Sequence, residues 1–126
     1  MTSASQTDQR ADVPFVARAT ETGARVEAST ANEVIAFYRR QQELIDTDLE
    51  WVFTEHPAVT SVPDSDSIDA VIRELDDHFE NGVPLGVLAA TMSKQGWTVG
   101  DTLSEVYELR MSGSIWEPRA DHIRPV

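Results

Sequence analysis

The chain has 126 residues, of which 40% are apolar, and a formal net charge of -12. This apolar content is enough for a packed core, and no run approaches the roughly 18 apolar residues of a membrane-spanning helix. The absence of cysteine excludes disulfides and thiolate metal sites, and the polar start, Met1 to Gln9, lacks the pattern of a secretory signal. We therefore expect a cytoplasmic protein without a membrane span.

The charge balance is strongly acidic, with 22 acidic and 10 basic residues, and Lys94 is the one lysine. This composition resembles that of proteins from halophilic archaea that accumulate salt, because carboxylates retain water and cations when molar salt competes for both. At that ionic strength the Debye length falls to about 3 Å, so an acidic surface repels itself little. An ordinary acidic bacterial protein is the alternative. In a halophile, the net charge by itself does not identify the partners.

Residues 1–28 are expected to form either a disordered tail or a short hairpin. Phe15, Val16 and Val26 flank the sequence Thr20–Gly23, which is a suitable turn for a hairpin. The segment is otherwise polar, and we favour the tail.

Residues 29–57 predict one long helix. Thr30 and Glu33 have the spacing of a capping box, apolar residues recur at near-helical spacing after it, and Pro57 ends the pattern. The extra helix resembles the one through which many winged-helix regulators dimerise. We hypothesise a homodimer formed by Val34, Tyr38, Ile45, Leu49 and Val52.

Residues 64–126 show the most regular signals. A helix is predicted over 67–79, a short helix over 84–96, a third helix over 98–113 and a β-hairpin over 114–124, each with its own capping or turn residues. This order is that of a winged helix-turn-helix domain, and an arbitrary helical bundle with a frayed end is the alternative. The expected fold class is therefore mainly α: three helices plus a C-terminal β-hairpin, preceded by the long N-terminal helix.

The sequence Gly113-Ser-Ile-Trp-Glu-Pro-Arg119, followed by His122-Ile-Arg124, closes the chain. It resembles the passage from the third helix into the wing of the C-terminal winged helix in archaeal minichromosome-maintenance helicases. The winged helix that ends the middle subunit of replication protein A is a more distant resemblance. No phosphate-binding Gly-x-x-x-x-Gly-Lys-Ser/Thr motif is present, so the resemblance implies a binding domain and not a helicase.

Winged helices mostly bind duplex DNA through the third helix. Its outward positions here are expected to be Val99, Asp101, Ser104, Glu105 and Glu108. Three of these five are acidic, and carboxylates facing phosphates are unfavourable. Basic residues lie before this helix, at its end and on the wing, and are the candidates for nucleic-acid contact; alternatively, the arginines pair with Glu108, Glu117 and Asp121. The candidate residues are Lys94, Arg110, Arg119, His122 and Arg124.

A protein partner is the competing interpretation. Acidic helix faces, together with Trp97 and Trp116, suit the docking of an arginine-bearing segment, although either tryptophan could instead belong to the core. The histidines, His56, His78 and His122, lack the spacing of metal ligands, and we find no catalytic arrangement, cofactor motif or small-molecule site. We expect a non-enzymatic binding protein associated with DNA, as a transcription regulator or replication accessory; a protein-only adaptor is the alternative.

Overall fold

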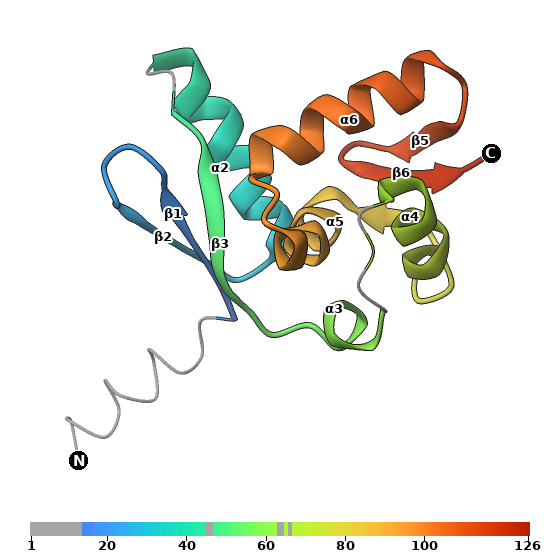
Figure 1. Ribbon diagram of the computed structural model, residues 1–126, viewed down its shortest axis with the longest axis horizontal. Coiled ribbons are helices and arrows are strands. Elements are labelled where there is room, and N and C mark those ends of the chain that lie inside the picture. The colour runs from blue at the N-terminus through green and yellow to red at the C-terminus, as the bar shows by residue number, and fades with distance from the viewer. Residues whose placement is uncertain (1–13, 45–46, 63–64, 66) are drawn as a thin grey trace.

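The computed structural model describes residues 14–44, 47–62, 65 and 67–126. Within them, the strands form two three-stranded antiparallel sheets, which lie on opposite sides of the central helix α5 (Figure 1). None of the described helices is both long enough and apolar enough to cross a membrane. The elements are β1 (Phe15–Ala19), β2 (Arg25–Ala28), α2 (Ala31–Leu44), β3 (Leu49–Thr54), α3 (Pro57–Ser61), α4 (Ile68–Asp76), β4 (Val83–Pro84), α5 (Leu85–Met92), the single 3-10 turn η1 (Ser93–Gln95), α6 (Val99–Met111), β5 (Ile115–Arg119) and β6 (His122–Pro125).

The expected fold class is wrong. The fold is mixed α/β, and not mainly α with a winged helix-turn-helix behind a long N-terminal helix. The helix predicted over residues 29–57 does not exist as one element, because α2 ends at Leu44 and Leu49–Thr54 form the strand β3. The capping part of that prediction is confirmed, since the Glu33 carboxylate accepts hydrogen bonds from the backbone N–H groups of Ser29 and Thr30 at 2.8 and 3.1 Å.

Strand β3 forms because a distant partner strand competes successfully with the local helical pattern. Trp51, Val52 and Phe53 are aromatic or β-branched residues, which fit a strand at least as well as a helix. Strand β1 pairs with them in antiparallel register, with Ala17 opposite Trp51 and Val16 opposite Phe53. The helical spacing of these residues could not reveal this pairing, because the partner lies more than thirty residues earlier in the chain.

The N-terminal segment forms the hairpin and not the favoured tail. β1 and β2 pair with Phe15 opposite Ala28 and Ala17 opposite Val26, and Gly23 closes the turn with a φ of +76°. A two-stranded hairpin is marginal alone, but β3 adds a third strand to give the order β2-β1-β3. The part of the predicted tail over residues 1–13 lies outside the described residues.

The elements after Ser67 come in the predicted order of helix, short helix, helix and hairpin. Both long helices begin at a capping side chain: the Ser67 hydroxyl accepts a hydrogen bond from Ala70 N at the start of α4, and Thr98 and Asp101 form a capping box on α6. The strand β4 is an addition, because Pro84 was expected in the first turn of a helix. β4 pairs with β6, and the second sheet has the order β4-β6-β5.

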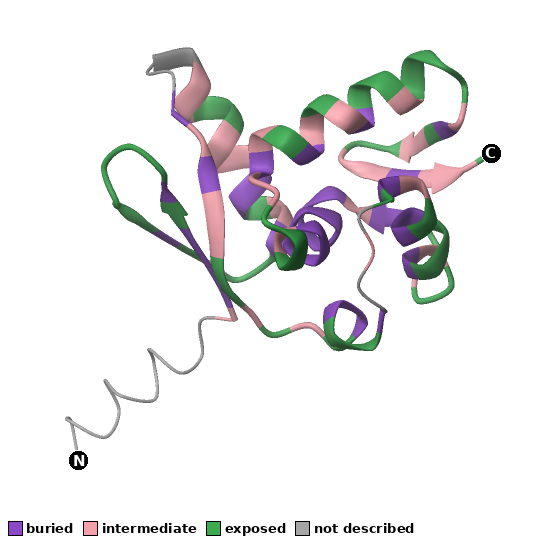
Figure 2. Ribbon diagram, in the orientation of Figure 1, coloured by how far each residue is buried: buried purple, intermediate pink, exposed green. Residues whose placement is uncertain are grey.

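Helix α5 is the centre of the core. All eight of its residues are buried, as Figure 2 shows, and the buried apolar side chains around it come from both ends of the chain, from Phe15 to Ile123. A Cβ on Gly86 would lie 2.2 Å from the carbonyl oxygen of Ala31, so the backbones of α2 and α5 are in direct contact. Only glycine permits this approach.

Two polar side chains tie segments together beside this contact. The Asn32 side chain accepts a hydrogen bond from Gly86 N at 2.7 Å and donates one to the carbonyl oxygen of Asp121 at 3.0 Å. The Lys94 ammonium donates to the carbonyl oxygens of Val59 and Val62, at 2.6 and 3.0 Å, at the end of α3. Each side chain connects elements that lie far apart in sequence.

The Asp48 carboxylate joins the N-terminal sheet to α6. One oxygen accepts hydrogen bonds from Leu49 N and Gly100 N, both at 2.7 Å, and the other accepts from the Thr98 hydroxyl at 2.6 Å. A carboxylate at the start of a helix also interacts favourably with the helix dipole. Asp48 therefore sets where α6 begins relative to β3.

Replacing Asp48 by Ala is expected to lower the free energy of unfolding by about 2–4 kcal/mol, because the Gly100 N–H and the Thr98 hydroxyl lose a charged acceptor. Asp48→Asn should cost less, since one acceptor oxygen remains. Chemical unfolding in molar KCl measures both. Asp77→Ala, which removes an exposed carboxylate at the end of α4, is the control; equal losses in both Ala variants would contradict the role of Asp48.

Candidate functional site

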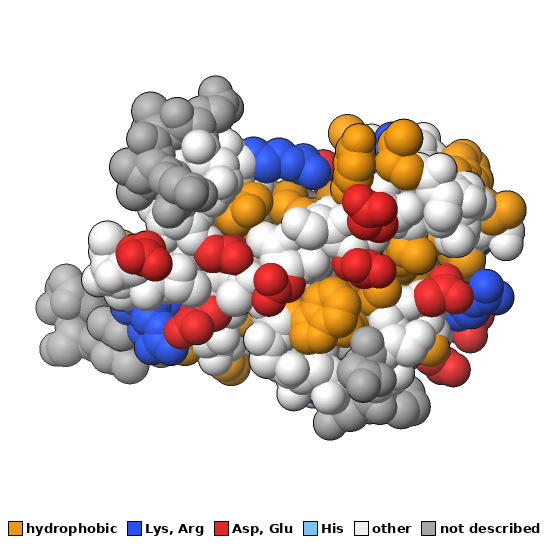
Figure 3. All heavy atoms as spheres, turned by 45° about the horizontal axis from the view of Figure 1, so that its top comes forward, with side chains coloured by type: hydrophobic (Ala, Val, Ile, Leu, Met, Phe, Trp, Pro, Cys, Tyr) orange, Lys and Arg blue, Asp and Glu red, His pale blue; other side chains and the backbone are white. Residues whose placement is uncertain are grey.

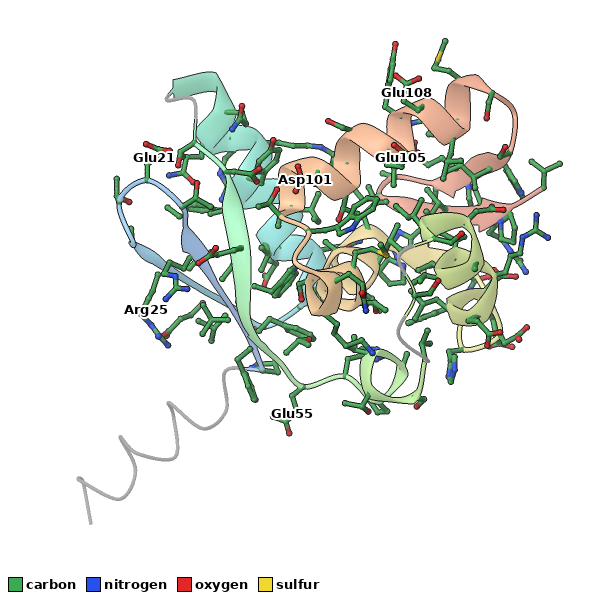
Figure 4. The ribbon with its side chains drawn as sticks, viewed as in Figure 1. Glu21, Arg25, Glu55, Asp101, Glu105 and Glu108 are labelled. Atoms are coloured by element: carbon green, nitrogen blue, oxygen red, sulfur yellow. The ribbon has the colours of Figure 1, made fainter. Side chains whose placement is uncertain are left out.

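The outward face of α6 combines carboxylates with exposed apolar side chains. Asp101, Glu105 and Glu108 follow one another along the helix at spacings of four and three residues, which place them on one stripe (Figure 4). Tyr107 and Met111, also four residues apart, are 60% and 69% exposed. Figure 3 shows acidic and apolar side chains side by side on the face of the molecule that carries α6. We call these five residues the α6 face.

The carboxylates of the α6 face are largely unneutralised. Asp101 accepts a hydrogen bond from Thr98 N at 3.1 Å within the capping box. Among the residues that the structure describes, Glu105 and Glu108 have neither an ion pair nor a side-chain hydrogen bond. Asp101 and Glu108 are exposed and Glu105 is half-buried, whereas Val99, which was also expected to face outward, is fully buried.

Two of the residues predicted to contact nucleic acid, Arg110 and Arg124, form ion pairs with carboxylates of the same chain. Arg110 forms an ion pair with Glu117 at 2.8 Å. Arg124 pairs with Asp76 at 3.2 Å and donates to the carbonyl oxygen of Glu80 at 3.1 Å. Pairing of these arginines with carboxylates of the chain was the alternative prediction, and Glu117 is one of the acceptors that it named.

The other predicted nucleic-acid residues do not form one cationic patch. Arg119 donates to His122 Nε2 at 3.1 Å, and the His122 Nδ1–H donates to the carbonyl oxygen of Ala120 at 2.8 Å. Arg119 and Arg124 line one hollow of about 210 Å³, whereas Arg110, on α6, lines a different groove. Lys94 is engaged with the end of α3. The residues are therefore divided among three places on the molecule.

The tip of the hairpin β5–β6 packs against the rest of the protein. Asp121 has a φ of +61°, and its carbonyl oxygen accepts hydrogen bonds from Leu85 N, at 2.9 Å, and from Asn32. Its carboxylate pairs with Arg39 on α2. The predicted pairing of Asp121 with an arginine exists, but the arginine comes from α2 and not from the hairpin. This tip is anchored to α2 and does not project as a free wing.

The two tryptophans predicted to bind a partner have different environments. Trp97 is half-buried against the core, as the alternative in the sequence analysis had it. Trp116 is 51% exposed and lines the same hollow as Arg119 and Arg124. Trp116 therefore remains available for a ligand.

The residues predicted to form a dimer interface do not share a surface. Val34 and Leu49 are fully buried within the chain, Tyr38 is half-buried, and Val52 is 45% exposed on β3. Ile45 lies outside the described residues. The expected face depended on one continuous helix over residues 29–57, but the helix α2 ends at Leu44 and Leu49–Thr54 form the strand β3.

Two histidines that are distant in sequence line one cleft of about 410 Å³. His56 and His122 lie at this cleft with Phe15 and Val87, which the sequence spacing could not show. His56 Nδ1 accepts a hydrogen bond from Ala58 N at 3.1 Å and so caps α3. Nδ1 of His56 is therefore occupied by a hydrogen bond within the fold.

The environment of His56 disfavours its protonated form. Burial lowers the pKa of His56 below the ordinary histidine value, and the positive charge of a protonated His78 lowers it further. The His56 ring also lies against Phe79, with 5.4 Å between the ring centroids. Protonation therefore opposes the packing between α3 and the end of α4.

Residues 73–123 match the family model of the HVO_B0008 C-terminal domain, a small domain family of haloarchaea. The match covers fewer than half of the residues, and it shows that the C-terminal half is similar to an archaeal domain family. The match is to this family, and no comparison connects the chain to the minichromosome-maintenance helicases. Neither the curated proteins nor the solved structures include a significant match to this chain.

His56 should make stability depend on pH. Because its folded pKa is lowered, the folded state should lose stability as the pH falls below about 6.5, the unfolded value, and keep it fully above that pH. His56→Asn retains a capping acceptor for Ala58 N but cannot titrate. Thermal melting between about pH 5 and 8 should show a smaller acid-induced loss in His56→Asn, and in His78→Gln, than in the wild type. Identical pH profiles would contradict this assignment.

Proposed function

We propose that this chain is a non-enzymatic protein-interaction module whose α6 face binds a basic, partly apolar segment of a partner protein. One observation carries the proposal. Glu105 and Glu108 are unpaired among the described residues and adjoin the exposed Tyr107 and Met111, while Arg110 and Arg124 are paired within the fold. A segment that presents arginine or lysine beside an apolar residue complements both parts of this face.

High salt changes which interactions matter on the α6 face. With a Debye length of about 3 Å in molar salt, charges attract a partner only when they are in contact. The free energy gained by burying Tyr107 and Met111 against a partner persists in high salt. Aromatic anchors commonly supply most of the affinity of an interface. We therefore assign affinity to the apolar residues, and selection of a basic partner to the carboxylates.

Binding of duplex DNA by α6 is less favourable on the same geometry. Asp101, Glu105 and Glu108 would face the phosphates, and the hairpin tip is held against α2 through Asp121. The hollow of Trp116, Arg119 and Arg124 is the better candidate for nucleic acid, because an aromatic ring beside arginines can stack a base. Arg124, however, is already paired with Asp76.

The proposal is tested with a fluorescein-labelled helical peptide that has leucines on one face and arginines on the other. Wild type is expected to bind it in molar KCl, and Glu105→Lys/Glu108→Lys should weaken binding about tenfold or more by replacing attraction with repulsion. Anisotropy titration measures both affinities. Glu21→Lys/Glu55→Lys makes the same charge change at exposed positions on the N-terminal half, away from α6 (Figure 4), and should leave binding unchanged.

Labelled duplex and single-stranded DNA are titrated in parallel, with Arg119→Glu/Arg124→Glu as the matching variant. DNA binding that this variant abolishes, together with no peptide binding, would replace the proposal with a nucleic-acid function at Trp116. Peptide binding that is equal in wild type and Glu105→Lys/Glu108→Lys would also overturn it, because the α6 face would not be the contact surface.

A further inference from the structure

A groove of about 160 Å³ runs beside the α6 face, between α6, α2 and the hairpin β5–β6. Leu85, Val106 and Ile123 are buried at its base. On its α6 side, Leu103 is half-buried and Tyr107 is exposed. The groove is therefore apolar at its base and opens next to the exposed part of α6.

Two ion pairs hold the groove at its rim. Arg39 of α2 pairs with Asp121, and Arg110 of α6 pairs with Glu117 at 2.8 Å. Glu117 also accepts a hydrogen bond from Asp121 N at 2.7 Å, so one connected network spans α2, the hairpin and α6. This network connects the two helices across the rim, and the groove is already formed without a partner.

The size of the groove indicates what it can hold. At roughly 30 Å³ for each water, it has room for about five waters, whereas sites for small organic ligands usually occupy about 300–1,000 Å³. One large apolar side chain matches the available space and the apolar base. A whole small-molecule ligand does not.

We propose that this groove receives one large apolar side chain, such as leucine or phenylalanine, from the same basic partner segment. The inference rests on the proposed function of the α6 face. Tyr107 belongs to both surfaces: with Met111 it forms an apolar ridge, with the groove on one side and Glu108 on the other. A segment lying along this ridge inserts its apolar residue into the groove and places its basic residues over the carboxylates.

A second copy of the chain is a poorer occupant than a basic partner. In a two-fold contact, the α6 face of one copy would meet the same face of the other, so Asp101, Glu105 and Glu108 would oppose identical carboxylates. Such a dimer gains no attraction between opposite charges, and the carboxylates that it brings into contact repel one another at distances comparable to the Debye length of about 3 Å. Charge complementarity therefore favours a different, basic chain.

The test compares two peptides that have the same arginines on an otherwise alanine helix, one with a central leucine and one with a central alanine. Wild type in molar KCl is expected to bind the leucine peptide about tenfold more tightly, because its side chain is buried. In Leu103→Ala/Tyr107→Ala, which removes one wall of the groove, the difference between the peptides should largely disappear. Phe53→Ala, at a 48% exposed residue of β3, is the control and should preserve the difference in affinity between the two peptides.

Methyl NMR of the wild type provides a readout that does not depend on the variants folding. The Leu103 and Val106 methyl resonances should shift with the leucine peptide and much less with the alanine peptide. If both peptides bind equally and Glu105→Lys/Glu108→Lys abolishes this binding, the proposed role of the groove is wrong and that of the α6 face is retained. No binding of either peptide to the wild type would overturn the groove and the proposed function together.

Discussion

The first turn of α6 is held by one carboxylate. Asp48, at the entry to β3, accepts hydrogen bonds from its neighbour Leu49 and from Thr98 and Gly100 at the start of α6. These hydrogen bonds link the N-terminal sheet to the first turn of α6, whose residues Val99, Thr102 and Val106 are buried in the core. Because a helix is straight over a few turns, the placement of its first turn also determines which face of α6 is turned outward. The proposed binding face is a consequence of this junction.

The fold distributes its charges unevenly. Arg39, Arg110 and Arg124 form ion pairs that connect α2, α4, α6 and the hairpin, so these scarce cations hold elements together. Glu105 and Glu108 remain unpaired within the described part of the chain. Each ion pair uses one carboxylate for each arginine, so in a chain with 22 acidic and 10 basic residues the net charge of -12 falls on carboxylates that have no cationic partner. This distribution is the physical basis for preferring a basic partner.

The candidate site was predictable in part. The outward positions of Asp101, Glu105 and Glu108 follow from helical spacing after the Thr98 cap, because both signals are local. The groove beside α6 was not predictable, because its base and rim come from α2, α5, α6 and the hairpin. The same limit applies to the arginines: the sequence shows that acceptors exist, but not that Arg124 meets Asp76, forty-eight residues earlier.

The sequence by itself determined the features that arise within one or two turns of chain: the caps of α4 and α6, the left-handed turn at Gly96 and the order of helices and hairpin after Ser67. The tertiary structure alone decided β3, β4 and the N-terminal hairpin, since a strand is stabilised by pairing with residues that lie far away in sequence. It also decided which charged side chains stay free. The hydrogen-bond partners of a helical cap lie within a few residues in the sequence, whereas the partners of these strands and of Arg124 lie far away and come close only when the chain folds.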